Sequence, residues 1–190
     1  MINLTIFASG GGSNAEAIIQ HFNNHPTIQV NLIISNKTTA GVLDRADRHQ
    51  IKKRVIDRTD FNDPKKMLGY LKETETGLIV LAGFLWLIPA YLVEAFPNKI
   101  INIHPALLPK YGGKGMYGQH IHRAVFENKE RESGITIHYV NPKYDEGNII
   151  LQARCPLQPD DSPEVIGRKV LALEHRFYPV TVEMVAIQSE

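Results

Sequence analysis

Residues 2–20, INLTIFASGGGSNAEAIIQ, join an apolar run to a helix-like pattern through three consecutive glycines. The run from Ile2 to Ala8 has the length and composition of a buried strand. The pattern that opens at Ser13 places apolar residues three and four positions apart, as an amphipathic helix does. We therefore expect a strand, a glycine turn and a helix, with Ser13 and Glu16 forming a capping box at the helix start.

The same order of elements repeats along the first half of the chain. Nearly continuous apolar runs, which are typical of strands covered on both faces, occupy residues 2–8, 30–35, 77–83 and 99–104. Helical patterns lie between or after these runs, at residues 13–21, 42–50, 63–73 and 89–95. Alternating strands and helices predict an α/β fold with a doubly wound, mostly parallel central sheet.

The second half of the chain has a different organisation. Residues 105–119 form a loop rich in proline and glycine, and a helical pattern follows at 119–128. Two consecutive apolar segments, 134–140 and 148–157, flank the turn sequence NPKYDEG. These segments predict an antiparallel C-terminal part of the sheet. A closing helix starts at residues 161–163 and runs toward Val185.

Composition limits the class of protein. The chain has 190 residues, of which 43% are hydrophobic, enough for one sizeable core, so we expect a single domain over residues 1–190. Lys and Arg number 21 against 20 Asp and Glu, and the charges are interspersed. This balance predicts binding to neither nucleic acid nor membrane surfaces. No stretch has the length and apolar character of a membrane span, and the N-terminus lacks a signal-peptide pattern.

Cysteine and histidine usage adds two expectations. The single cysteine, Cys155, cannot form an internal disulfide, which fits a reducing compartment, so we expect a cytoplasmic protein. The eight histidines have no spacing with carboxylates or thiols that is typical of metal ligands, so we expect no metal site.

The glycine turn has two interpretations. It can be an ordinary tight turn, or a site where the unpaired N–H groups and positive end of a helix bind a phosphate. Gly10, Gly12 and Ala15 also match a dinucleotide-binding fingerprint. That fingerprint requires an acidic residue after the second strand, where this chain has Ser35 and the dipeptide 36–37, Asn-Lys. NAD is therefore disfavoured, and an NADP-type site is weakened.

The segment that ends in Asn102 and His104 carries the clearest chemical signal. The two residues are two positions apart on a predicted strand, so their side chains share one face, and Pro105 ends the strand. Ligands of α/β sheets bind at such carboxyl ends. An amide N–H and an imidazole N–H can both donate to an oxygen that becomes negative. The only cysteine precedes Pro156 in a predicted strand, so we expect direct transfer without a covalent enzyme intermediate.

A turn with two carboxylates, Asp145 and Glu146, precedes Gly147. The simplest interpretation is a solvated turn. Alternatively, the turn brings a carboxylate beside His104, where it orients the imidazole and accepts a proton. Sequence spacing leaves both interpretations open.

Five motifs in order resemble those of folate-dependent formyltransferases: SGGGSN (9–14), LAGF (81–84), NIHPALLPKY (102–111), DEGNIILQ (145–152) and LEHRFYP (173–179). They span nearly the whole chain. The opening SGGGSN is similar to the phosphoribosylglycinamide formyltransferase family within that group. The resemblance implies a Rossmann-like formyltransferase fold. It also implies transfer of a formyl group from 10-formyltetrahydrofolate to the amine of glycinamide ribonucleotide in purine biosynthesis.

The resemblance also implies roles for individual residues. The segment that holds the substrate phosphate corresponds to Gly12, Ser13 and Asn14. The catalytic trio corresponds to Asn102, His104 and Asp145. In the family, Asn102 and His104 stabilise the oxyanion, and Asp145 keeps the imidazole in its working state and assists proton removal. Glu174 matches a carboxylate near the substrate amine, although the sequence by itself favours a surface residue on the closing helix.

The folate pocket of the family corresponds to several further residues. Folate-binding positions match Leu85, Trp86, Leu87, Ile88, Asn102 and the loop 141–145 with Asn141, Tyr144 and Asp145. The phosphate-binding half then spans about residues 1–100, and the folate and catalytic half about 101–190. The substrates are small molecules, and we expect a monomer or a homodimer.

Three departures from the family pattern concern the edges of this pocket. The family often has a basic residue at the position of Trp86. It often has another near the position of Pro64, where this chain has a basic residue, Lys65, at the next position. The usual short loop is replaced by GGKGMYGQ at 112–119, in which Lys114 is a candidate phosphate contact or a solvated loop residue. Two alternative functions stay open, namely a 10-formyltetrahydrofolate hydrolase and an NADP-dependent reductase.

Overall fold

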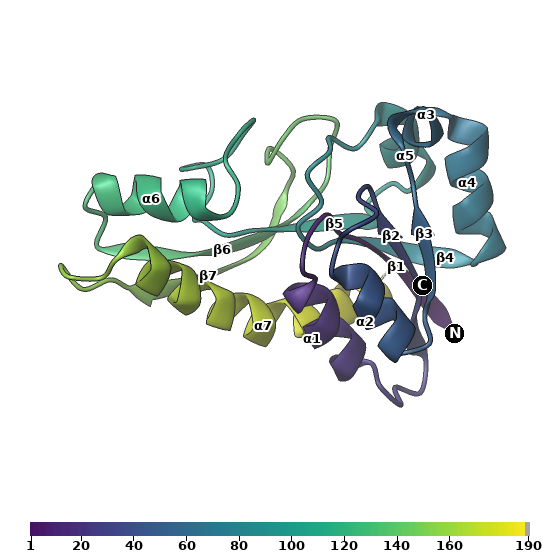
Figure 1. Cartoon of the computed structure of the whole chain (residues 1–190), viewed down its shortest axis with the longest axis horizontal. Helices are drawn as coiled ribbons and strands as arrows, with labels where there is room; N and C mark the ends of the chain where they lie inside the picture. The colour runs from purple at the N-terminus through teal and green to yellow at the C-terminus, as the bar shows by residue number, and fades with distance from the viewer. Residues whose placement is uncertain (189–190) are drawn as a thin grey trace.

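A computed structural model describes residues 1–188 of the chain, which fold around one seven-stranded sheet (Figure 1). The strands are β1 (Ile2–Phe7), β2 (Ile28–Ser35), β3 (Lys52–Val55), β4 (Thr76–Leu81), β5 (Ile100–His104), β6 (Glu132–Tyr139) and β7 (Ile149–Pro156). The helices are α1 (Ser13–His21), α2 (Val42–Arg48), α3 (Arg58–Asn62), α4 (Pro64–Glu73), α5 (Ala90–Ala95), α6 (Gln119–Glu127) and α7 (Pro163–Gln188).

The strand order is β3-β2-β1-β4-β5-β6-β7. Pairing is parallel from β3 through β5, whereas β5 with β6 and β6 with β7 pair antiparallel. The predicted fold class, a mostly parallel α/β sheet with an antiparallel C-terminal part, is confirmed. The order reverses between β1 and β4, and such a reversal is where α/β sheets open a crevice for ligands.

The apolar runs are continuous because the parallel strands are buried on both faces. Within β1, Leu4 and Ile6 belong to the core shared with α1, α2, α6 and α7, and Phe7 belongs to the core shared with α4 and α5. In the same way, Leu78 of β4 faces the first core and Ile79 faces the second. Each such side chain stabilises the fold by about 1.5–3 kcal/mol through burial.

Two elements were not predicted from the sequence. The strand β3 has the sequence KKRV, in which Lys52 and Lys53 are exposed, and it forms the edge of the sheet by pairing with β2. Short, charged strands are usual at sheet edges, where they discourage pairing with other chains. The short helix α3 starts at Arg58, with the side chain of Asp57 as its cap.

The long helix α7 is tied to two neighbouring central strands, at the last residue of β4 and near the start of β5. The fully buried Tyr178 donates its hydroxyl hydrogen to the carbonyl of Leu81 at 2.8 Å and lies 3.4 Å from the carbonyl of Ile101. This anchor fixes the preceding turn of α7, including Glu174, against β4 and β5.

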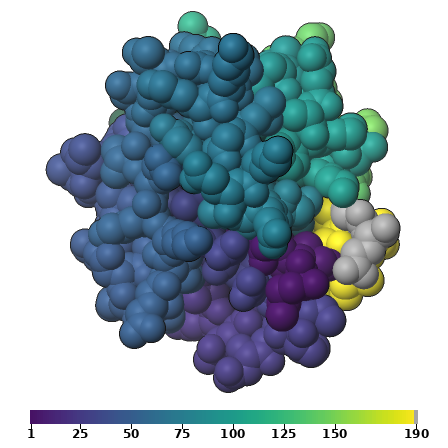
Figure 2. Space-filling view, turned by 90° about the vertical axis from the view of Figure 1, so that its right-hand side faces the viewer, coloured from purple at the N-terminus to yellow at the C-terminus, as the bar shows by residue number. Residues whose placement is uncertain are grey.

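The first residues of the chain lie beside the end of α7 on one face of the molecule (Figure 2). Within residues 1–188, no helix combines the length and hydropathy that crossing a bilayer requires.

Candidate functional site

A cavity of about 610 Å³ opens at the carboxyl ends of β1, β4 and β5. It lies at the reversal of strand order, where a ligand site is expected. Its walls come from the glycine turn, the segment after β4, the end of β5, the glycine-rich loop 113–118, the acidic turn and α7. Asn102, His104, Asp145 and Glu174 all line this one space.

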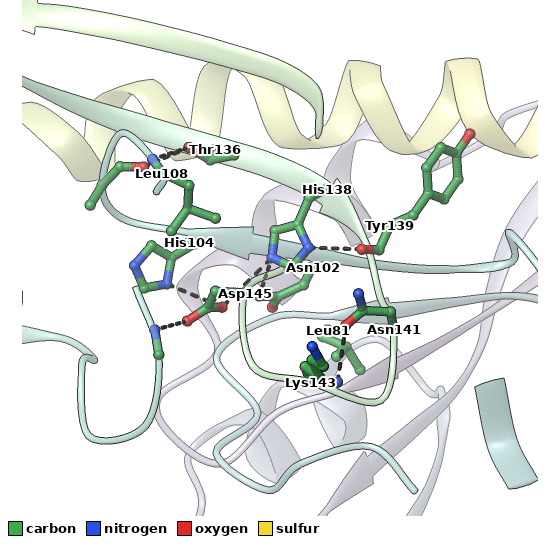
Figure 3. A network of polar contacts seen from close by, with 12 residues as sticks. Leu81, Asn102, His104, Leu108, Thr136, His138, Tyr139, Asn141, Lys143 and Asp145 are labelled. Carbon is green, nitrogen blue, oxygen red and sulfur yellow. Dashed lines mark hydrogen bonds and ion pairs between the residues drawn. The ribbon is translucent and has the colours of Figure 1, made fainter. Parts of the chain in front are cut away.

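The orientation of His104 is fixed by the loop that follows β5. Its Nε2 donates to the carbonyl of Tyr111 at 2.8 Å, because a carbonyl can only accept. The proton therefore resides on Nε2, and Nδ1 is the atom that gains or loses a proton. Nδ1 lies 3.5 Å from Oδ1 of Asp145 (Figure 3). The acidic turn thus lies beside the imidazole, which sequence spacing left open.

The loop between β5 and α6 is held by Thr136, which pairs with His104 across β5 and β6. Its hydroxyl donates to the carbonyl of Ala106 at 2.7 Å and accepts from the N–H of Leu108 at 3.0 Å. These bonds set the path of the loop and hence the position of the Tyr111 carbonyl.

The carboxylate of Asp145 is held in its ionised form. Burial raises its pKa, but nearby His138, the charge of His104 and the N–H of Gly113 outweigh burial and bring the pKa below its usual value. The Gly113 N–H donates to Oδ2 at 2.9 Å. This bond links the acidic turn to the glycine-rich loop.

The imidazole of His104 favours its neutral form. Burial lowers its pKa below the usual value, and the charge of Asp145 only partly opposes this effect. A buried neutral imidazole with one nitrogen already committed as a donor is suited to accept a proton at the other nitrogen.

Sequence reasoning missed His138, which lies opposite Asn102 in the pairing of β5 with β6. Its Nδ1 donates to the carbonyl of Tyr139 at 2.8 Å, and its Nε2 lies 3.1 Å from Nδ2 of Asn102 and 3.7 Å from Oδ1 of Asp145. Figure 3 shows Asp145 between the two imidazoles. His138 orients the Asn102 amide, whose second N–H can donate to a bound oxygen. Only the strand register identifies this role, and register was not available from spacing.

The predicted capping box is wrong. Gly12 is the residue at the N-cap, with φ of 74°, and no side chain caps the helix. Glu16 instead accepts from Nη1 of Arg45 at 2.9 Å and from Nε2 of His49 at 2.8 Å. Tertiary partners have replaced the local cap, which leaves the first N–H groups of α1 available to a ligand.

The position expected for Glu174 from the sequence alone is also wrong, since the residue is only 8% exposed. Its Oε2 accepts from Nδ2 of Asn14 at 2.8 Å, which joins α7 to α1. Burial raises the pKa of Glu174 to about 7, although the hydrogen bond from Asn14 opposes the rise. Oδ1 of Asn14 is buried and has no partner within residues 1–188. The pair therefore presents acceptors to a donor such as an amine.

The residues that were predicted to bind folate line one cavity. They are Leu85, Trp86, Leu87, Ile88, Asn102, Asn141, Tyr144 and Asp145. Trp86 packs on Phe61 and Phe84, and the guanidinium of Arg58 lies 4.0 Å above its ring. Gly10, Asn14 and Lys114 also line the cavity, whereas Gly12 and Ser13 are not among the lining residues.

Across residues 1–188, no group of three or more His, Cys, Asp or Glu side chains is arranged to hold a metal ion.

Comparison with known proteins gives a consistent set of relatives. The family model described as "Formyl transferase" matches residues 2–182. The chloroplastic phosphoribosylglycinamide formyltransferase of Arabidopsis thaliana is 40% identical over 181 residues, which cover 92% of this chain and 62% of the relative. The Haemophilus influenzae phosphoribosylglycinamide formyltransferase is 36% identical over 189 residues, covering 96% and 86%. The chain thus spans about three fifths of the length of the plant relatives it matches.

Solved structures match over the same extent. The crystal structure of glycinamide ribonucleotide transformylase 1 from Symbiobacterium toebii has a TM-score of 0.89 and 32% sequence identity, covering 99% of this chain and 89% of that one. The phosphoribosylglycinamide formyltransferase of Bacillus halodurans has a TM-score of 0.87 and 34% identity, covering 99% and 97%.

Proposed function

Because the chain belongs to the formyl transferase family, we propose that it transfers the formyl group of 10-formyltetrahydrofolate to the amine of glycinamide ribonucleotide, a step of purine biosynthesis. The observation that carries this proposal is the composition of a single cavity. An amide, an imidazole and a carboxylate from Asn102, His104 and Asp145 lie between a glycine turn and an apolar wall. The names of the matched relatives support the same acceptor and the same transferred group.

The two ends of the cavity suit the two substrates. The phosphate of the ribonucleotide binds at the start of α1, where Gly12, Ser13 and Asn14 present N–H groups. The pterin binds along the wall formed by residues 85–88 and 141–145, where apolar side chains and backbone groups are exposed to the cavity. Glu174 then lies on the ribonucleotide side and accepts a hydrogen bond from the substrate amine.

The reaction starts when the amine nitrogen attacks the formyl carbon. A C–N bond forms, and the carbonyl electron pair moves to oxygen, which becomes an oxyanion. Nδ2 of Asn102 donates to that oxygen, and preorganised donors of this kind are worth about 3–4 kcal/mol of barrier lowering. Collapse of the intermediate breaks the bond between the carbon and N10 of tetrahydrofolate.

Proton balance assigns His104 its role. The attacking nitrogen loses one proton and N10 gains one, so one group can carry the proton between them. Nδ1 of His104 accepts it, because Nε2 is already committed to Tyr111. The ionised Asp145 stabilises the imidazolium, and the positive charge of the ring in turn stabilises the nearby oxyanion electrostatically.

The test is an assay of tetrahydrofolate release from 10-formyltetrahydrofolate with either glycinamide ribonucleotide or water alone as acceptor. The proposal predicts release only when the ribonucleotide is present. Release with water alone at a comparable rate would identify a hydrolase instead. The NADP-dependent reductase alternative is not favoured, since the relatives are named as formyltransferases.

We further propose that residues 1–190 act as one formyltransferase domain, with the phosphate held by about residues 1–100 and the chemistry by about 101–190. Residues 189 and 190 lie outside the described part. The folate wall at 85–88 belongs to the first half, so the division passes through the cavity. We propose a cytoplasmic protein that acts on small molecules as a monomer or a homodimer. We also propose that it has no nucleic acid or membrane partner, which the balanced charge of the chain supports.

A further inference from the structure

The glycine turn is fixed from outside by α2. The N–H of Val42 donates to the carbonyl of Gly10 at 3.1 Å. One turn further along α2, Nε of Arg45 donates to the carbonyl of Gly11 at 2.6 Å. Two successive peptide carbonyls of the turn are therefore directed at the same helix.

Because each peptide is planar, fixing its carbonyl also fixes the direction of its N–H group. In such a peptide the N–H points opposite to the carbonyl of the preceding residue. The bond to Val42 therefore turns the N–H of Gly11 away from α2, and the bond to Arg45 does the same for the N–H of Gly12. Neither N–H has a hydrogen-bond partner in the described chain, residues 1–188. Gly10 and Asn14, which flank these groups, line the cavity.

The conformation of Gly12 adds to this arrangement. Gly12 is left-handed, at φ 74° and ψ 33°, and right-handed Ser13 follows it. A left-handed residue next to a right-handed one makes successive N–H groups converge on a concave site for an anion. Contact with α2 also requires a glycine at position 12, because a Cβ there would lie 2.6 Å from Cγ2 of Val42.

The side chain of Arg45 is itself held in place. Its Nη1 donates to Oε2 of Glu16 at 2.9 Å, and the side chain is 27% exposed. Burial by itself raises the pKa of Glu16, but hydrogen bonds from Arg45 and His49 bring it down to about 2. Glu16 is therefore ionised at any working pH, and the guanidinium spans from a carboxylate on α1 to a carbonyl of the turn.

We infer that Arg45 is a positioning residue for the substrate phosphate: its guanidinium holds the peptide between Gly11 and Gly12 so that the N–H groups of the turn meet the anion. The guanidinium acts through the peptide plane and does not touch the phosphate. This inference rests on the proposed function, because it takes the phosphate of the ribonucleotide as the anion bound at the turn.

The kinetic test compares Arg45→Ala, Arg45→Lys and a matched control, Arg48→Ala. Arg48 lies one turn along the same helix and approaches Glu16 at 3.7 Å, and its side chain is 64% exposed. Arg45→Ala is expected to raise KM for glycinamide ribonucleotide at least tenfold, with kcat and KM for the formyl donor within about threefold of wild type, the split expected when binding energy alone is lost. Arg48→Ala is expected to leave all three constants within twofold.

Two further measurements separate positioning from charge and from folding. Arg45→Lys keeps the charge but cannot reach the carbonyl and Glu16 together, so it is expected to resemble Arg45→Ala. If it matches wild type instead, charge alone matters and the inference fails. With glycinamide riboside, which lacks the phosphate, Arg45→Ala and wild type are expected to have the same kcat/KM. If Arg45→Ala instead lowers kcat/KM for the riboside as much as for the ribonucleotide, Arg45 has a general structural role and the inference is overturned.

A binding measurement keeps this inference separate from the proposed reaction. Calorimetry of glycinamide ribonucleotide without folate is expected to give a dissociation constant at least tenfold higher for Arg45→Ala than for wild type. If wild type binds the ribonucleotide but transfers no formyl group, the proposed reaction fails while this comparison still stands. If the variant binds as tightly as wild type, the inference on Arg45 fails whatever the reaction.

Discussion

Nδ1 of His104 lies 3.5 Å from Oδ1 of Asp145, while Nε2 of the same ring donates to the carbonyl of Tyr111 at 2.8 Å. The first distance exceeds that of a hydrogen bond, and the second is within the normal range. The ring is therefore fixed at one nitrogen and free to change protonation at the other. Catalytic pairs often tighten only when substrate is bound, so we expect this pair to close when Nδ1 receives a proton.

Replacing Asp145 by Asn keeps the shape of the acidic turn and removes its charge. We expect kcat to fall by about 10²–10⁴-fold, the usual contribution of acid–base catalysis. The charge of Asp145 raises the pKa of His104, so its loss lowers that pKa further. The acid limb of kcat/KM should therefore move to lower pH, as measured between pH 5 and 9. The matched control is Glu146→Gln in the same turn, and equal effects of the two changes would contradict the assignment.

The buried carboxyl of Glu174 predicts a pH-dependent stability. Burial raises its pKa in the folded protein to about 7, above the usual 4.5 of a glutamate, so the folded state binds the proton more tightly. The wild type should lose stability as pH rises from about 4.5 to 7, and Glu174→Gln should not. The stability of the variant relative to wild type should rise by on the order of 2–3 kcal/mol between pH 5 and pH 8.

Urea unfolding at the two pH values measures this difference. Glu94→Gln, on the exposed face of α5, is the control and should show no such change. A Glu174→Gln difference that is the same at pH 5 and pH 8 would mean that this carboxyl does not carry the raised pKa.

Replacing Gly12 or Gly69 by alanine should have opposite effects on the stability of the folded protein. At Gly12, alanine must adopt a positive φ and would place Cβ 2.6 Å from Val42, so Gly12→Ala should destabilise by about 2–4 kcal/mol. Gly69 lies within α4 with open space at its Cβ position. Gly69→Ala should stabilise by about 0.5–1 kcal/mol. Thermal unfolding distinguishes the two, and a neutral Gly12→Ala would contradict the described turn.

Trp86 offers a direct signal for the folate end of the cavity, because it is the single tryptophan of the chain and lines the cavity. Binding of a folate analogue should change the intrinsic fluorescence in a saturable manner. Trp86→Phe should bind the analogue, as measured by calorimetry, without that signal. If calorimetry detects binding to the wild type while Trp86 emission stays constant, the analogue binds elsewhere.

The sequence was sufficient for the parallel core because strands buried on both faces leave an unmistakable apolar run. Leu78 and Ile79 illustrate this, since consecutive residues enter the two opposite cores. The same rule explains the omission of β3, whose residues 52–55 are charged and become a strand only by pairing with β2. Local pattern therefore predicts interior strands and overlooks edges.

At the candidate site, local chemistry was predictable and tertiary partners were not. Asn102 and His104 follow from a period of two on one strand. His138 depends on the register between β5 and β6, and the burial of Glu174 depends on Asn14 from a helix 160 positions away. The predicted capping box at Ser13 was also wrong because of tertiary partners, since Arg45 and His49, distant in the sequence, bind the carboxylate of Glu16.

In the proposed reaction, His104 moves the proton and its positive charge supports the oxyanion. Its most direct test is the single-turnover rate of formyl transfer by His104→Ala, with 10-formyltetrahydrofolate and glycinamide ribonucleotide both saturating. We predict a rate at least about 100-fold below that of wild type, in line with acid–base catalysis. A variant that transfers the formyl group within a few-fold of the wild-type rate would contradict the account.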